Sequence, residues 1–86
     1  MKDLTLVIPA KNEPESLPNV LIELEKLNVN YLIVLEKTDY ITINAIEKFK
    51  SNIIFQVKKG YGDAIILGIQ NVKTKYFSIF NADGSF

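Results

Sequence analysis

The sequence predicts an α/β domain in which helices cover both faces of a parallel sheet, a three-layer α/β/α arrangement. One observation is that four short apolar runs, rich in β-branched and aromatic residues, recur at residues 4–9, 31–35, 53–57 and 76–80. A second is that the three segments between them carry apolar residues at helical spacing. Strands that alternate with helices through short connections favour a four-stranded parallel sheet with right-handed crossovers.

The first strand, residues 4–9, is apolar at odd and even positions alike, as in strands that are covered on both faces. Pro9 ends it. The next apolar residues fall on one helical stripe, and Pro14 and Pro18 lie in or before its first turn, where proline is tolerated. These features predict a helix over residues 14–27.

The second strand is predicted at residues 31–35, and either Thr38 or Asp39 can cap the helix that follows it. We expect this helix to bury an apolar stripe and to end at residues 50–52. The stripe consists of Ile41, Ala45, Ile46 and Phe49.

The third strand, residues 53–57, leads through the turn Gly60-Tyr61-Gly62 into a third helix. Apolar residues repeat at helical spacing from Ala64 to Val72, and the small residues Ala64 and Gly68 predict close approach of this helix to the sheet. The last strand, residues 76–80, has the composition of a buried strand.

The composition excludes several classes of function. The chain has 10 basic and 10 acidic residues, so no net charge would attract nucleic acid or an anionic membrane. It has no cysteine and no histidine, which excludes disulfides, ordinary zinc sites and Ser-His-Asp or Cys-His nucleophile systems. A bound metal would need oxygen ligands, which favours Mg²⁺ or Mn²⁺.

The 86 residues are expected to form one domain, residues 1–86, with a thin core. No apolar run reaches the roughly 20 residues that span a bilayer. We therefore expect a cytoplasmic protein without a membrane segment.

Polar residues follow each predicted strand, and in a parallel sheet these strand-to-helix loops meet at one edge. The four sets are residues 10–13, 36–39, 58–63 and 81–85. At this edge Asp83 follows the last strand, where a carboxylate beside a phosphate commonly holds a metal ion. The sequence therefore predicts a ligand site formed by segments that are far apart in the chain.

Each of these residues also has a purely structural interpretation. Asn12 and Glu13 suit the first turn of a helix, where acceptors and negative charge are favourable. Gly60 and Gly62 suit a tight turn, and Asp63 suits a helix cap better than a catalyst. The absence of a third glycine at dinucleotide spacing, and of a glycine-rich turn after the first strand, argues against NAD and P-loop sites.

Two motifs give the chain a resemblance to a known family. The segment at residues 6–18, with Pro9-Ala10-Lys11-Asn12-Glu13 at its centre, resembles the opening of the family 2 glycosyltransferases of GT-A fold. It is most similar to that of dolichol- or polyprenyl-phosphate sugar synthases. The turn and helix at residues 59–69 and the segment Asn81-Ala82-Asp83-Gly84-Ser85 look like the family's later glycine turn and D-x-D motif.

The resemblance implies a site for a UDP- or GDP-linked sugar donor. In it, Pro9, Ala10 and Glu13 line the nucleotide, with Glu13 near the base or ribose, and Glu36 contacts the nucleoside. Asp83 would coordinate a divalent cation, Mg²⁺ or Mn²⁺, that bridges the diphosphate. The full set of donor-binding residues that it implies is Pro9, Ala10, Asn12, Glu13, Glu36, Lys59, Gly60, Gly62, Asn81, Ala82 and Asp83.

The chain departs from the family pattern at two positions. Asn81 replaces the first aspartate of D-x-D, and an amide is a weaker metal ligand than a carboxylate. Lys37 stands where the family has the second carboxylate of an acidic pair.

The resemblance also implies the strand order 3-2-1-4 of a truncated GT-A, Rossmann-like half domain. The acceptor site and the general base would lie in a part of the family's domain that this sequence does not contain. The last strand would then lie at an edge, so we expect a homodimer or larger assembly, with pairing through residues 76–80.

Two other functions fit parts of the pattern. One is a catalytically inactive α/β interaction module that retains only the fold, which the changes at Asn81 and Lys37 favour. The other is a nucleotidyltransferase of related architecture, which would have a glycine-rich turn where this chain has Ala10-Lys11-Asn12-Glu13.

Overall fold

The computed structural model describes residues 3–49 and 52–83, and its strands and helices alternate along the chain as predicted. The elements are β1 (Leu4–Pro9), α1 (Ser16–Leu27), β2 (Asn30–Glu36), α2 (Tyr40–Ala45), β3 (Ile53–Gln56), α3 (Tyr61–Gln70) and β4 (Tyr76–Ile79). Gly84 and Ser85, the last two residues of the polar set predicted at residues 81–85, lie outside the described residues.

The four strands form one parallel sheet in the order β3-β2-β1-β4, which confirms the predicted order. β1 lies inside the sheet, where it pairs with β2 from Thr5 to Pro9 and with β4 from Leu4 to Val7. All strand-to-helix loops therefore leave the sheet at the same edge, at the carboxyl ends of the strands.

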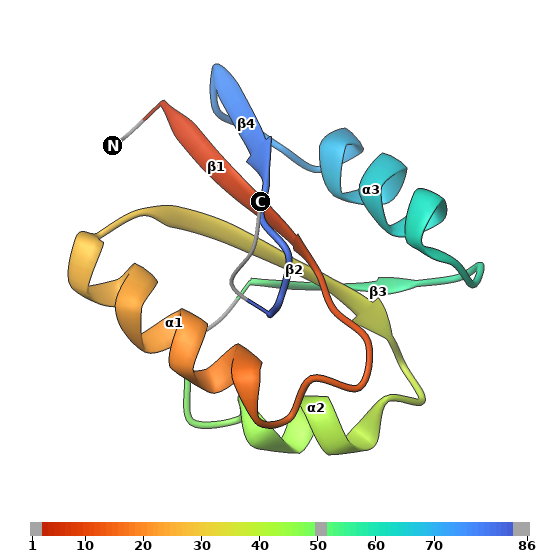
Figure 1. The fold of residues 1–86 in the computed structure, drawn as a ribbon. Coiled ribbons are helices and arrows are strands. Elements are labelled where there is room, and N and C mark those ends of the chain that lie inside the picture. The colour runs from red at the N-terminus through yellow and green to blue at the C-terminus, as the bar shows by residue number, and fades with distance from the viewer. Residues whose placement is uncertain (1–2, 50–51, 84–86) are drawn as a thin grey trace.

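The helices form a layer on each face of the sheet (Figure 1): α1 and α2 cover one face and α3 covers the other. Alternate residues of β1 face opposite layers. Leu6 and Ile8 belong to the larger core cluster with α1, whereas Val7 belongs to the smaller cluster beside α3. This burial on both faces explains why β1 is apolar at every position.

The contact of α3 with the sheet depends on Gly68. A Cβ atom at this position would overlap Cγ1 of Val7 and would lie 3.2 Å from Cγ2 of Val34. Ala64, on the same face of the helix, is only 2% exposed. The predicted role of the two small residues in close packing is therefore confirmed.

The structure corrects the prediction for α2. The helix ends at Ala45, and turns follow it up to Phe49. Its inward face carries Thr42, which is fully buried, whereas Ile41 is 65% exposed. The predicted cap is confirmed in part, because it is Asp39, and not Thr38, whose side chain accepts the backbone N–H of Thr42.

Two smaller corrections concern α1 and α3. α1 begins at Ser16, after a turn at Pro14 and Glu15 across which the N–H of Leu17 donates to the carbonyl oxygen of Glu13. α3 begins three residues earlier than its apolar pattern, with Gly60 as the cap residue at φ 110°. Asp63 lies inside the first turn of α3 and is not its cap.

β4 is an edge strand, and its first half is more exposed than a buried-strand composition predicts. Tyr76 is 57% exposed and Phe77 is 45% exposed, because β1 is the neighbour of β4 on one side only. Among the residues that the structure describes, no helix has the length and apolar character needed to cross a membrane.

Candidate functional site

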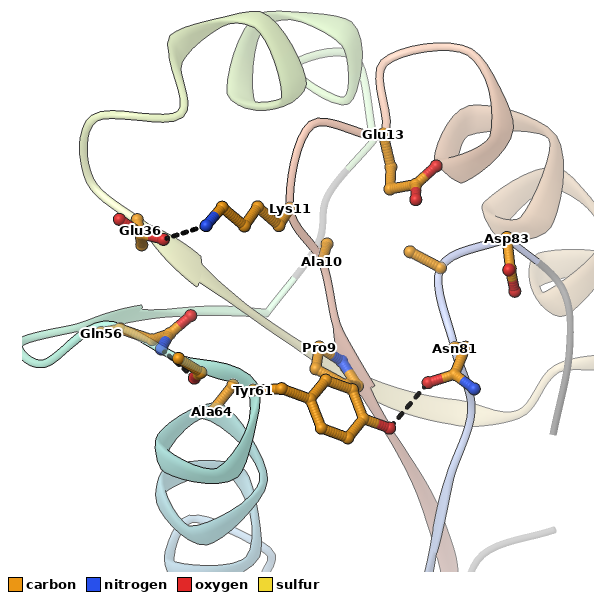
Figure 2. Close-up of a pocket in the computed structure, with 12 residues that line it drawn as sticks. Pro9, Ala10, Lys11, Glu13, Glu36, Gln56, Tyr61, Ala64, Asn81 and Asp83 are labelled. Carbon is orange, nitrogen blue, oxygen red and sulfur yellow. Dashed lines mark hydrogen bonds and ion pairs between the residues drawn. The ribbon is translucent and has the colours of Figure 1, made fainter.

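A pocket of about 390 Å³ lies at the carboxyl ends of the strands (Figure 2). All four polar segments that the sequence places at this edge contribute to it, so the predicted convergence is confirmed. Its lining residues are Pro9, Ala10, Lys11, Glu13, Glu36, Gln56, Gly60, Tyr61, Ala64, Asn81, Ala82 and Asp83. The volume is in the range of small-molecule sites.

The loop between β1 and α1 is held by hydrogen bonds from its backbone. The N–H of Ala10 donates to the carbonyl oxygen of Val34 at 2.9 Å, which continues the pairing of β1 with β2. Asn12 has a φ of 52°, a left-handed conformation that asparagine tolerates, and its N–H donates to Oδ2 of Asp39 at 2.8 Å. The Asp39 carboxylate that caps α2 thus also anchors the loop.

Glu13 is held at both its backbone and its side chain. Its N–H donates to Oγ1 of the buried Thr42 at 3.0 Å, and its carboxylate accepts the hydroxyl of Ser16 at 2.5 Å. Its carbonyl accepts the N–H of Leu17, in the first turn of α1. The structural role expected for Glu13 near the start of a helix is therefore present, together with its place in the pocket wall.

One end of the pocket is formed by Glu36, the last residue of β2, with Lys11 and Gln56 beside it (Figure 2). The Glu36 side chain is 17% exposed. Among the described residues its carboxylate has one charged partner, the Lys11 ammonium, at 3.8 Å from Oε2. This distance is too long for a hydrogen bond, so a largely buried carboxylate at the pocket wall retains acceptor capacity.

Gln56 on β3 is the direct neighbour of Glu36 on β2 in the register of the sheet. Its Nε2 donates to the carbonyl oxygens of Lys58 at 3.1 Å and of Gly60 at 3.0 Å. Since carbonyl oxygens only accept, these two bonds determine which way round the amide lies. These hydrogen bonds of the Gln56 side chain stabilise the turn between β3 and α3.

The opposite end of the pocket follows β4. The Tyr61 hydroxyl donates to Oδ1 of Asn81 at 2.8 Å, which joins the start of α3 to the segment after β4 (Figure 2). Ala82 is buried and Asp83 is exposed at the pocket.

The fit of a divalent cation can be judged from these oxygen atoms. Within residues 3–49 and 52–83, no group of three or more His, Cys, Asp or Glu side chains is close enough to hold a metal. Asn81 already uses Oδ1 to accept a hydrogen bond from Tyr61. Mg²⁺ typically binds through one or two carboxylates together with substrate phosphates and water. The exposed Asp83 carboxylate fits a site in which one carboxylate binds the cation together with phosphate and water oxygens.

Most of the residues assigned to the site from the sequence line this pocket, and three do not. Asn12, Lys59 and Gly62 lie outside the lining. Asn12 acts in the loop through its backbone, and Gly62 lies in the first turn of α3.

Four lining residues were not assigned to the site from the sequence: Lys11, Gln56, Tyr61 and Ala64. Gln56 is the last residue of β3, but the sequence predicted that this strand continues to residue 57, so no sequence signal placed Gln56 at a strand end. Lys11 and Tyr61 belong to loops that were expected to converge, and nothing in the spacing distinguishes them from their neighbours.

Comparison with known proteins gives a family match over nearly the whole chain. The family model described as glycosyl transferase family 2 matches residues 5–86. Uncharacterized glycosyltransferases of Mycobacterium bovis and Mycobacterium tuberculosis are 29% identical over 82 residues, which cover 95% of this chain and 37% of theirs. The chain thus spans little more than a third of the length of these relatives. No solved structure matches at a significant level.

Proposed function

Because the chain belongs to glycosyltransferase family 2, we propose that its pocket binds the nucleoside diphosphate of a UDP- or GDP-linked sugar and that Asp83 engages a divalent cation on that diphosphate. The chain spans 37% of the length of its relatives, so we assign to it the binding of the sugar donor. No described residue is assigned as the base that deprotonates the acceptor.

The observation that carries this proposal is the pocket made by all four strand-end segments. From β3 to β4 the sheet order gives three inter-strand spacings, or about 14 Å. This span suits an extended nucleoside diphosphate that lies across the ends of the strands. The two ends also differ in chemistry, since one offers Glu36 and Gln56 and the other Asn81 and Asp83.

In this arrangement Pro9 and Ala10 form the floor beneath the ribose, because β1 lies between β2 and β4. Asp83 lies at the diphosphate end, where the cation would supply positive charge to offset the charge that develops on the leaving diphosphate. Glu13 is pre-oriented by Ser16 and Thr42, so it can accept a hydrogen bond from the donor without rearrangement.

Titration calorimetry of the 86-residue chain with GDP and UDP, in Mn²⁺ and in EDTA, tests the proposal. We expect at least one nucleotide to bind about tenfold or more tightly in Mn²⁺ than in EDTA, and Asp83→Asn to remove that gain. Asp3→Asn, an exposed carboxylate before β1, is the matched control and should behave like wild type. The proposal fails if neither nucleotide binds and Asp83→Asn is indistinguishable from wild type.

A second candidate function is an interaction module that retains the fold without its ligand. It is favoured by Asn81, which stands in place of a carboxylate and whose Oδ1 is engaged by Tyr61. The absence of nucleotide binding in the same titration would support it.

For the whole protein we propose an activity like that of the polyprenyl-phosphate sugar synthases, which residues 6–18 resemble. We propose a cytoplasmic location of this domain because no apolar run of the sequence reaches the roughly 20 residues that span a bilayer. We also propose self-association through the exposed edge of β4, which Tyr76 and Phe77 make apolar.

A further inference from the structure

We infer that the pocket selects guanine over the other nucleobases and that Glu36 is the residue that reads the base. The inference rests on the proposed function, because it requires that a nucleoside diphosphate occupy the pocket. It goes further in naming the base, which neither the family match nor the relatives specify. The end of the pocket made by Glu36, Gln56 and Lys11 carries the argument.

The position of this end assigns it to the base. Asp83 marks the diphosphate end at β4, and β1 separates it from Glu36 on β2 and Gln56 on β3. In a nucleoside diphosphate the ribose joins the base to the phosphates. A ligand whose diphosphate lies beside Asp83 and whose ribose lies over β1 therefore places its base at Glu36 and Gln56.

The hydrogen-bonding capacity of this end is mostly that of an acceptor. The carboxylate of Glu36, 17% exposed, has no hydrogen-bond donor among the described residues, and Lys11 lies at 3.8 Å. A largely buried carboxylate without a hydrogen-bond donor favours a ligand whose N–H or O–H groups can donate to it. Lys11, 73% exposed, adds one cationic donor beside the carboxylate.

Gln56 adds a further acceptor, and its orientation does not depend on an arbitrary assignment of the amide atoms. Nε2 faces the carbonyl oxygens of Lys58 and Gly60, so Oε1 must face the other way. Figure 2 shows this oxygen directed toward the side of the pocket where Glu36 and Lys11 lie. The base thus meets two neighbouring acceptor groups and one cationic donor.

Guanine is the base whose edge complements this set. Its N1–H and 2-amino group are adjacent donors, which a carboxylate can accept in bidentate fashion, and its O6 can accept from Lys11. Uracil offers one N–H between two carbonyl oxygens, so one of these oxygens would face an acceptor of the protein. Adenine and cytosine each place a ring-nitrogen acceptor next to their amino group, and it would meet the carboxylate.

Calorimetric titration of the 86-residue chain in saturating Mn²⁺ tests the base preference. We expect GDP to bind about ten- to hundredfold more tightly than UDP or ADP, the discrimination typical of a bidentate contact. Inosine diphosphate, which lacks the 2-amino group, should bind more weakly than GDP by about tenfold.

The variant Glu36→Gln separates base reading from a general loss of binding. An amide accepts at one atom and donates at the other, so GDP should weaken by about ten- to hundredfold. Xanthosine diphosphate, which has a carbonyl oxygen in place of the 2-amino group, should bind this variant more tightly than it binds wild type. Glu23→Gln, a carboxylate on α1 that is 70% exposed, is the control and should change neither affinity.

The possible outcomes distinguish this inference from the proposed function. Equal affinity for UDP and GDP, or a Glu36→Gln variant that weakens both by the same factor, would overturn the guanine assignment and leave nucleotide binding intact. Unchanged GDP affinity in Glu36→Gln would do the same. If no nucleoside diphosphate binds at all, the proposed function fails and this inference fails with it. A thermal unfolding scan of each variant shows whether it is folded.

Discussion

At the scale of single residues, the loop that borders the pocket depends on two side chains of the α2 segment. Asp39 accepts the backbone N–H of Asn12 at 2.8 Å and that of Thr42 at 3.4 Å, so one carboxylate fixes both a loop and a helix. Thr42, fully buried, accepts the N–H of Glu13. The bonds to Asn12 and Glu13 join residues that are 27 and 29 positions apart in the sequence. The bond to Glu13 also gives the buried Thr42 hydroxyl a hydrogen-bond partner.

Replacing Thr42 by valine tests the importance of that buried hydroxyl. Valine has nearly the same shape but cannot accept the N–H of Glu13, so we expect a loss of about 1–3 kcal/mol in the free energy of unfolding. Urea denaturation measures it. Thr42→Ser, which keeps the oxygen, should lose less stability than Thr42→Val, and the reverse order would contradict the assigned role.

The same two residues show how far residue-level prediction reaches. Asp39 could be predicted as a helix cap because its type and position before an apolar pattern are local signals. The burial of Thr42 could not, because its partner is Glu13, which is distant in the sequence. In the pocket, Asp83 was predicted from its place after a strand and Glu36 from the resemblance, whereas Gln56 required knowledge of its register beside Glu36.

At the scale of elements, α3 shows that a small residue can be more favourable than a better helix former. Gly68 lowers intrinsic helix stability by about 1 kcal/mol relative to alanine. The contact with Val7 that it permits would be obstructed by any Cβ atom. The sequence pattern was sufficient to predict the close approach of the helix to the sheet, because small residues recur on its apolar stripe, but it did not identify Val7 as the contacting residue.

A matched pair of substitutions in α3 separates packing from helix propensity. We expect Gly68→Ala to lower the free energy of unfolding by about 1–3 kcal/mol, since the new methyl group must displace Val7. Gly62→Ala, in the first turn of the same helix with no atom within 4 Å of the added Cβ, should be neutral or stabilising by up to about 1 kcal/mol. Equal effects of the two changes would show that close packing is not the reason for Gly68.

α2 shows where element-level prediction fails. Two stripes fit helical spacing in this short segment, one that begins at Ile41 and one that begins at Thr42, and both include Ile46 and Phe49. Hydrophobicity alone selects the first, yet Ile41 is 65% exposed and Thr42 is fully buried. The cap at Asp39 and the hydrogen bond from Glu13 to Thr42 determine which face of the helix turns inward. A helix of six residues has too few positions for the sequence to reveal that face.

At the scale of the whole molecule, the topology accounts for the convergence of the site. A parallel sheet brings every strand-to-helix loop to one edge, so alternation of strands and helices was enough to predict that four distant segments meet. The order of the strands then arranges the pocket from Gln56 to Asp83. The shape of the pocket, to which Tyr61 contributes, depends on side-chain packing that no spacing rule contains.

The edge of β4 leads to a prediction about assembly. We expect the isolated 86-residue chain to sediment as a dimer or larger species at high micromolar concentration, because Phe77 is 45% exposed on β4, which has a strand neighbour on one side only in the described sheet. Phe77→Lys should shift it toward the monomer. A wild-type chain that sediments as a monomer in this concentration range would refute the prediction.

The hydrogen bonds of Gln56 have a consequence for how the specificity of such a pocket can evolve. Its amide nitrogen holds the turn between β3 and α3, so a substitution there that alters the ligand contact also loosens the turn. The carboxylate of Glu36 supports no backbone segment of the described chain, and its exchange is tolerable to the fold. Specificity for a new donor nucleotide should therefore evolve first by substitution of Glu36. Substitution of Gln56 should follow only in proteins stable enough to tolerate the loss of its two hydrogen bonds.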